Sequence, residues 1–152
     1  MRPAARGLRP EEEAAMADQL EVGLLIQPVN TRDWERCEAG AFDRSPAVTD
    51  AQVWDNIKQV GLLAEELGFD ALWITEHHRT PYGMSPNPLQ FLAYMAGRTE
   101  RIDLGAAVVV LPWHDPVRVA EDIAQLDNLA GDRRIRVGFG RGAAASEYEH
   151  LR

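Results

Sequence analysis

Titratable side chains end an apolar run in the stretch LWITEHHRTPYG, where Glu76, His77 and His78 come directly before a turn. A strand that ends in this way places acid–base groups at the edge of a sheet. Imidazole titrates near neutral pH, so a histidine here is a candidate acid or base beside a bound cofactor. A loop of solvated polar groups is the alternative. Successive side chains on a strand point to opposite faces, so we expect His77 and His78 to diverge and predict no metal site.

A second apolar run contains GAAVVV, in which Gly105, Ala106 and Ala107 have almost no side chain. Small residues let a flat ligand approach the backbone closely. Close packing between neighbouring strands is an equally good explanation of these three residues taken alone.

A third stretch, GFGRG, places Gly138, Gly140 and Gly142 around Arg141. Glycine weakens a strand, so its repetition suggests that a ligand or another backbone approaches closely. An arginine at the end of a strand can hold a phosphate through charge-assisted hydrogen bonds. A plain surface turn is the alternative.

Strands and helices must bring these three stretches together. The sequence contains four apolar runs that alternate with three amphipathic segments. The expected strands cover residues 20–29, 69–76, 102–112 and 135–142. The expected helices cover residues 50–68, 88–97 and 116–131, with a long polar connection over 30–50. Strands that are apolar on both faces and alternate with helices predict an α/β fold with a parallel sheet. The pattern leaves open an eight-stranded barrel or a doubly wound sheet.

The composition excludes several classes of protein. The chain has 152 residues, 45% of them apolar, and a net charge of -8. These values predict one domain over residues 20–152 and no nucleic-acid or membrane partner. Cys37 is the one cysteine, which excludes an internal disulfide and fits a cytoplasmic protein. Residues 1–19 lack the apolar core of a secretory signal and are expected to form a disordered leader.

Taken together, GFDALWITEHH, the run from LGAAVVVLPWHDP to GFGRG, and the trailing SEYEH resemble the bacterial luciferase-like flavin monooxygenases. The resemblance implies the TIM-type β/α barrel, of which the chain has the first four strands only. Members of that family are more than twice as long. We therefore expect a truncated, amino-terminal half barrel with little or no activity alone.

The family resemblance also implies a cofactor and the residues that hold it. Reduced FMN, supplied by a flavin reductase, would react with O2 to oxidise an aldehyde or another small organic substrate. His77 would lie beside the flavin, with Glu76 as a second catalytic residue. The residues expected to contact FMN are Ala106, Ala107, Val108, Gly140, Arg141 and Gly142, with Arg141 on the phosphate.

Further expectations concern the loop after the second strand and the state of the chain. Tyr82 and Met84 are candidate substrate contacts. The family places a non-proline cis peptide at Ala107-Val108, whereas in a half barrel we expect a trans bond there. Self-association or a missing carboxyl-terminal half would cover the open sheet. The alternatives are a deazaflavin-dependent hydride-transfer enzyme on the same barrel and a non-catalytic half barrel that binds a partner chain.

Overall fold

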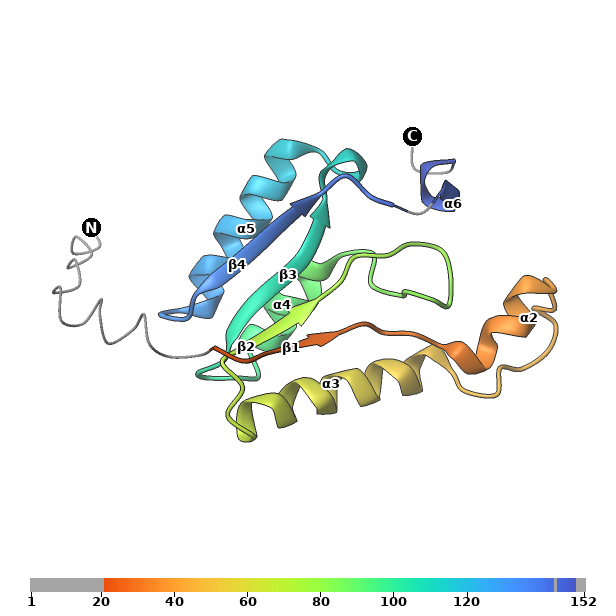
Figure 1. Cartoon of the computed structure of the whole chain (residues 1–152), viewed down its shortest axis with the longest axis horizontal. Helices are drawn as coiled ribbons and strands as arrows, with labels where there is room; N and C mark the ends of the chain where they lie inside the picture. Colours follow the sequence, from red (N-terminus) through yellow and green to blue (C-terminus); the bar gives the residue numbers. More distant parts are fainter. Residues whose placement is uncertain (1–20, 144, 150–152) are drawn as a thin grey trace, which may run out of the picture.

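A parallel sheet of four strands forms the centre of the computed structural model, which describes residues 21–143 and 145–149. The leader expected over residues 1–19 lies outside the described residues. The strands are β1 (Gly23–Ile26), β2 (Ala71–Ile74), β3 (Asp103–Val110) and β4 (Ile135–Gly140). All of them run in the same direction, so their carboxyl ends gather at one end of the molecule (Figure 1).

The spatial order of the strands is β1-β2-β3-β4, the same as their order along the chain. A doubly wound sheet reverses its strand order at a switch point, whereas a barrel adds each strand beside the last. The order therefore favours the barrel arrangement. β1 and β4 form the two open edges of the described sheet.

Three long helices connect the strands, and each begins at a residue that the sequence marks as a cap. They are α3 (Asp50–Glu66), α4 (Pro88–Ala96) and α5 (Pro116–Ala130). Thr49 forms a capping box with Gln52, and the side chains of Asn87 and Asp115 accept backbone N–H bonds at the other two starts. Gly131 ends α5 with a φ of 70°, a conformation that glycine adopts without strain.

The structure adds short helices that were not predicted. They are η1 (Thr31–Asp33), α2 (Trp34–Glu38), η2 (Leu111–Trp113) and α6 (Ala145–Tyr148). η1 and α2 lie within the polar connection over residues 30–50, and η2 begins where the strand expected over residues 102–112 was to continue. α2 has only five residues, so it shows no helical periodicity that a sequence pattern could reveal.

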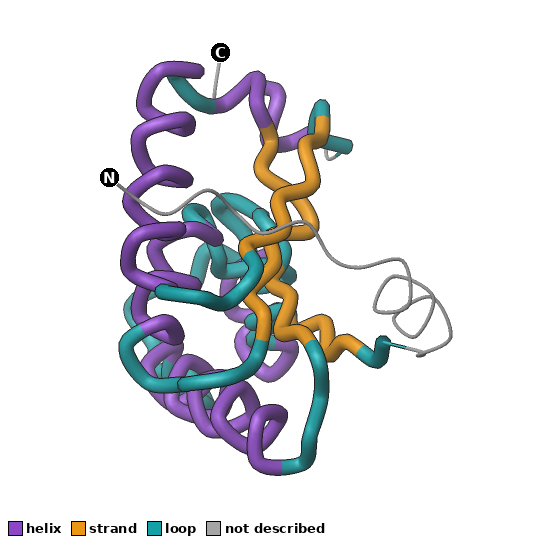
Figure 2. The backbone as a smooth tube through the Cα atoms, turned by 90° about the vertical axis from the view of Figure 1, so that its left-hand side faces the viewer, coloured by secondary structure: helices purple, strands orange, loops and turns teal. Residues whose placement is uncertain are grey.

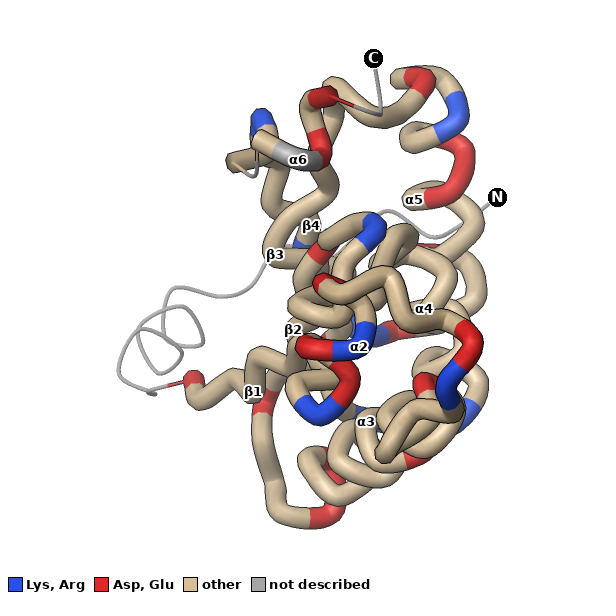
Figure 3. Tube along the Cα trace, turned by 90° about the vertical axis from the view of Figure 1, so that its right-hand side faces the viewer, with Lys and Arg blue, Asp and Glu red and all other residues tan. Residues whose placement is uncertain are grey.

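The long helices lie on one side of the sheet, and the hydrophobic core lies between the two layers (Figure 2). Leu72, Ile74 and Leu104 are fully buried on that side, against Leu92 and Met95 of α4. Within the part of the chain that the structure describes, no helix is long and apolar enough to cross a bilayer. Acidic and basic residues are interspersed along the chain (Figure 3).

Within residues 21–143 and 145–149, no helix covers the other face of the sheet (Figure 2). The Trp73 indole lies across the middle of this face, where a Cβ on Gly23 or Gly105 would come within 2.7 Å of its atoms. Leu25 of β1 pairs with Trp73 and remains 56% exposed on the same face. These apolar side chains are in the position that the interior of a closed barrel would bury.

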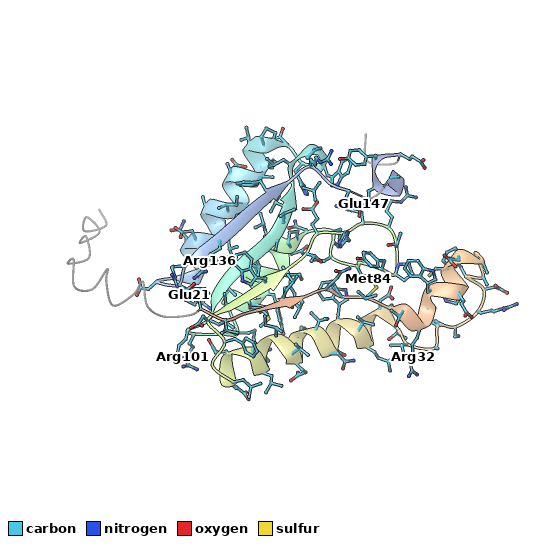
Figure 4. The ribbon with its side chains drawn as sticks, viewed as in Figure 1. Glu21, Arg32, Met84, Arg101, Arg136 and Glu147 are labelled. Carbon is cyan, nitrogen blue, oxygen red and sulfur yellow. The ribbon has the colours of Figure 1, made fainter. Side chains whose placement is uncertain are left out.

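Ion pairs gather at the amino ends of the strands. Arg136 of β4 contacts Glu21 at 2.5 Å and Asp103 at 3.0 Å, and Arg134 contacts the same two carboxylates. Figure 4 places Glu21 and Arg136 at one end of the sheet and Glu147 and Met84 at the other. The charged network is thus remote from the carboxyl ends.

Candidate active site

Glu76, directly after β2, is the buried centre of a polar cluster at the carboxyl ends of the strands. Its side chain is fully shielded from solvent. Oε1 lies 2.9 Å from His78 Nε2 and 2.8 Å from His114 Nε2, and Oε2 accepts the Val110 backbone N–H at 2.9 Å. A buried carboxylate is stable only with such partners. Glu76 therefore fixes two imidazoles and does not itself reach the open surface.

His77 faces a different carboxylate from its neighbour, although β2 ends at Ile74 and strand alternation therefore does not extend to these two histidines. Its Nδ1 lies 3.5 Å from Glu147 Oε1, and the same oxygen accepts the backbone N–H of His78 at 2.9 Å. Glu147 is buried, with 4% of its surface exposed, whereas 28% of the His77 side chain is accessible. His77 is thus a half-exposed imidazole supported from behind by a buried carboxylate.

The loop after β2 fixes the position of the His77 ring. A Cβ on Gly83 would lie 2.2 Å from His77 Cβ, so only glycine leaves room for the histidine there. The Tyr82 ring packs edge-on against the imidazole, with the ring centroids 5.3 Å apart. The His77 backbone N–H donates to the Ser85 carbonyl at 3.0 Å.

Helix α6 is held over the end of β4 by aromatic contacts. The Tyr148 ring packs edge-on against Trp113, with the centroids 4.7 Å apart, and the Tyr148 hydroxyl donates to the carbonyls of Arg141 and Gly142. Gly142 has a φ of 81°, and a Cβ there would meet Trp113 at 3.0 Å. These contacts bring Glu147 back to the end of β2.

The small residues of β3 divide between the two faces of the sheet. Ala106 is fully buried in the helix-covered core, so its side chain does not form the expected wall. Ala107 and Val108 are half-buried. The peptide bond between them is cis, so the expectation of a trans bond in this chain is wrong. The prediction assumed that only a closed barrel surrounds this bond with neighbouring strands. In this chain, β4 already pairs with β3 on both sides of the bond.

The glycines of β4 lie against Val108 rather than beside open space. A Cβ on Gly138 would lie 3.1 Å from the Val108 side chain, and one on Gly140 would lie 2.4 Å from it. Close approach of the neighbouring strand, rather than of a ligand, therefore accounts for Gly138 and Gly140. The exposed Arg141 side chain has no polar partner among the described residues, which leaves its guanidinium available to a ligand.

A pocket of about 490 Å³ opens between the loop after β1 and the loop after β2. His77 and Met84 line it, together with Phe42 and Pro81. A volume of this size suits a small organic ligand. Met84 thus lines the pocket, and its role as a substrate contact stays a prediction. Tyr82 is 51% exposed and supports the His77 ring without lining the pocket.

Two charged groups of this pocket, Arg36 and Asp33, are paired with each other. Arg36 holds both oxygens of the buried Asp33 at 2.5 Å, and this hydrogen bond lowers the pKa of Asp33. Burial raises the pKa of the Cys37 thiol, and its hydrogen bond to Asp33 adds to that effect. Cys37 is therefore a protonated thiol at neutral pH, not a nucleophilic thiolate.

Sequence reasoning found Glu76 and His77 but missed their partners. His114 and Glu147 are 38 and 70 residues away from these two residues along the chain. The trailing SEYEH was the only signal for Glu147. Among the residues that the structure describes, no group of His, Cys, Asp or Glu is arranged to hold a metal ion.

Comparison with known proteins supplies the family. The model described as luciferase-like monooxygenase matches residues 39–151. The chain belongs to the luciferase-like monooxygenase family. Luciferase-like relatives include the alkanal monooxygenase alpha chain of Photorhabdus laumondii, which is 38% identical over 97 residues, 64% of this chain and 27% of that protein.

Other members of the luciferase-like family extend this comparison. The oxygenase component of the flavin-dependent trigonelline monooxygenase from Acinetobacter baylyi is 32% identical over 68% of this chain and 28% of its own length. The monooxygenase RslO1 from Streptomyces bottropensis superposes with a TM-score of 0.72 at 28% identity, over 87% of this chain and 36% of its own. The matched part thus spans about a quarter to a third of these relatives.

The luciferase-like fold also occurs in a solved flavin complex. The oxygenating constituent of 3,6-diketocamphane monooxygenase from Pseudomonas putida, a type II Baeyer-Villiger enzyme solved in complex with FMN, superposes with a TM-score of 0.70 at 24% identity. It covers 87% of this chain and 32% of its own. This similarity supports the barrel fold, of which four strands are described here.

Proposed function

We propose that the chain forms the amino-terminal half of an FMN-dependent monooxygenase that uses reduced flavin and O2 to oxidise an aldehyde or another small organic molecule. The observation that carries this proposal is the position of His77. A half-exposed imidazole, backed by a buried carboxylate, lines a pocket at the carboxyl ends of the strands. In a β/α barrel, the active site forms at that end.

The residues at the carboxyl ends fit a flavin mononucleotide. Thr75 Oγ1 is buried without a partner in the described part of the chain, and it lies beside Glu76, where a polar ligand atom could satisfy it. The Arg141 guanidinium has no polar partner among the described residues, and its geometry matches a phosphate. Ala107 and Val108 have small side chains near the carboxyl end of β3. Gly142 allows the tight turn that follows Arg141.

Each residue then has a defined task. The bound reduced flavin supplies the reaction with O2. Arg141 orients the flavin by its phosphate, and Ala107 with Val108 supports the flat ring. Met84 and the apolar residues of the pocket hold the organic substrate and exclude water. His77 takes or gives a proton at its exposed nitrogen. Glu76 acts indirectly, by fixing His78 and His114.

The proposal includes two partners. Reduced flavin must come from a reductase, and the relative from Acinetobacter baylyi is the oxygenase component of such a system. A second set of strands, from a carboxyl-terminal half or another copy of the chain, must cover the bare sheet face around Leu25 and Trp73. We place this system in the cytoplasm, where reduced nicotinamide and flavin are generated.

A spectroscopic titration separates the three functions that the sequence leaves open. FMN, a deazaflavin cofactor and riboflavin are each added to the protein, and the ligand absorbance and fluorescence are recorded. The proposal predicts that FMN binds more tightly than both others. Tighter binding of the deazaflavin would favour hydride transfer. A protein that perturbs none of the three spectra would favour the non-catalytic half barrel.

A further inference from the structure

Two adjacent histidines use different ring nitrogens to face a buried carboxylate. His78 faces Glu76 through Nε2, at 2.9 Å, and His77 faces Glu147 through Nδ1, at 3.5 Å. His114 repeats the geometry of His78, with Nε2 at 2.8 Å from Glu76. The contrast concerns which nitrogen of each ring carries hydrogen.

An ionised carboxylate has lone pairs and no hydrogen, so it attracts a ring nitrogen only if that nitrogen carries a proton. Nε2 must therefore be the protonated nitrogen of neutral His78 and His114. In His77 the protonated nitrogen must be Nδ1. In a neutral imidazole, the contact at one ring nitrogen therefore decides whether the other nitrogen carries a proton.

We infer that Glu147 is a positioning residue that holds neutral His77 in the Nδ1–H tautomer and leaves Nε2 as a free base toward the pocket. No residue in the described ranges hydrogen-bonds His77 Nε2. A neutral histidine in water prefers the opposite tautomer, with hydrogen on Nε2. Glu147 thus converts the exposed nitrogen of His77 from a donor into an acceptor.

The surroundings of His77 make this arrangement rigid. Gly83 and Tyr82 restrict the ring from the loop side, so it cannot flip without moving that loop. Glu147 is fixed by the packing of Tyr148 on Trp113 and by the hydrogen bond from the His78 N–H. The carboxylate therefore lies at a defined place behind the ring, although its helix has only four residues.

The tautomer is a property of this chain alone, and its use as a base rests on the proposed function. The two claims fail separately. Loss of FMN binding in the titration above would remove the flavin function and leave the tautomer claim intact. An incorrect tautomer would remove the role of Glu147 and leave the flavin function intact.

The test is 15N NMR of the protein labelled at its histidines, recorded at about pH 9, well above the ordinary imidazole pKa. Magic-angle spinning allows the measurement whatever the size of the assembly. Each ring nitrogen gives a distinct shift when it is protonated or bare, and His→Gln variants assign the four histidines. We expect Nδ1–H for His77 and Nε2–H for His78 and His114.

Variants of Glu147 connect the tautomer to the carboxylate. Glu147→Ala should move the major His77 population to Nε2–H, whereas Glu147→Gln, which retains an acceptor oxygen, should keep Nδ1–H. Glu149→Ala, an exposed neighbour on the same segment, should change nothing. A wild-type His77 that carries hydrogen on Nε2, or a tautomer that stays the same in Glu147→Ala, would overturn the inference.

Discussion

His114 Nε2 lies 2.8 Å from Glu76 Oε1, although 38 residues separate the two in the sequence. The contact joins the segment after β3 to the end of β2. Because His78 binds the same oxygen and the Val110 backbone binds the other, one buried carboxylate fixes the ends of both β2 and β3. The carboxyl ends of these strands are thereby held in a single geometry.

Removing the Glu76 carboxylate should destabilise the protein. Glu76→Ala leaves three donors without an acceptor, and each unsatisfied buried group costs about 1–3 kcal/mol. We expect a total loss of about 3 kcal/mol, equivalent to ~10 °C in the thermal midpoint. Glu121→Ala is the matched control, because its ion pair with Arg118 is exposed and should change the midpoint by at most ~2 °C. Equal midpoints for the two variants would show that the Glu76 cluster carries no stability.

Arg141→Ala should discriminate between two flavins that differ by a phosphate. A charge-assisted contact contributes about 1.5–3 kcal/mol, so FMN should bind roughly 10- to 150-fold more weakly. Riboflavin lacks the phosphate and should bind the variant as it binds the wild type. Arg118→Ala, which removes an exposed arginine of α5, is the control. If both flavins lose the same affinity in Arg141→Ala, Arg141 does not hold the phosphate.

The bare sheet face should drive self-association of the isolated chain. Covering ~400 Å² of apolar surface is worth ~10 kcal/mol before the cost of association. Light scattering after size exclusion, at micromolar concentration, should give a mass above 16.9 kDa. Leu25→Lys, on the bare face, should reduce that mass, and Leu67→Lys, directly after α3, should not. A sharp wild-type peak at the monomer mass, without binding of hydrophobic dyes, would contradict this prediction.

Local signals predicted the framework of this protein well. Thr49, Asn87 and Asp115 marked the three helix starts, because a cap acts within its own turn. The clustering of Glu76 with His114 was not predictable in this way, because it depends on the register of β2 against β3. The buried side of Ala106 was missed for a related reason, since a run that is apolar on both faces does not indicate which face meets the helices.

The most direct test of the proposed chemistry is the transfer of labelled oxygen by a complete barrel that contains this segment. The enzyme is supplied with reduced FMN, 18O2 and an aldehyde, and the labelled product is measured by mass spectrometry. We predict incorporation of one labelled atom, at a rate that His77→Ala lowers by about 100-fold or more while FMN affinity stays within about threefold. His78→Ala should have a smaller effect on this rate. Unlabelled product, or a larger loss of rate in His78→Ala than in His77→Ala, would contradict the account.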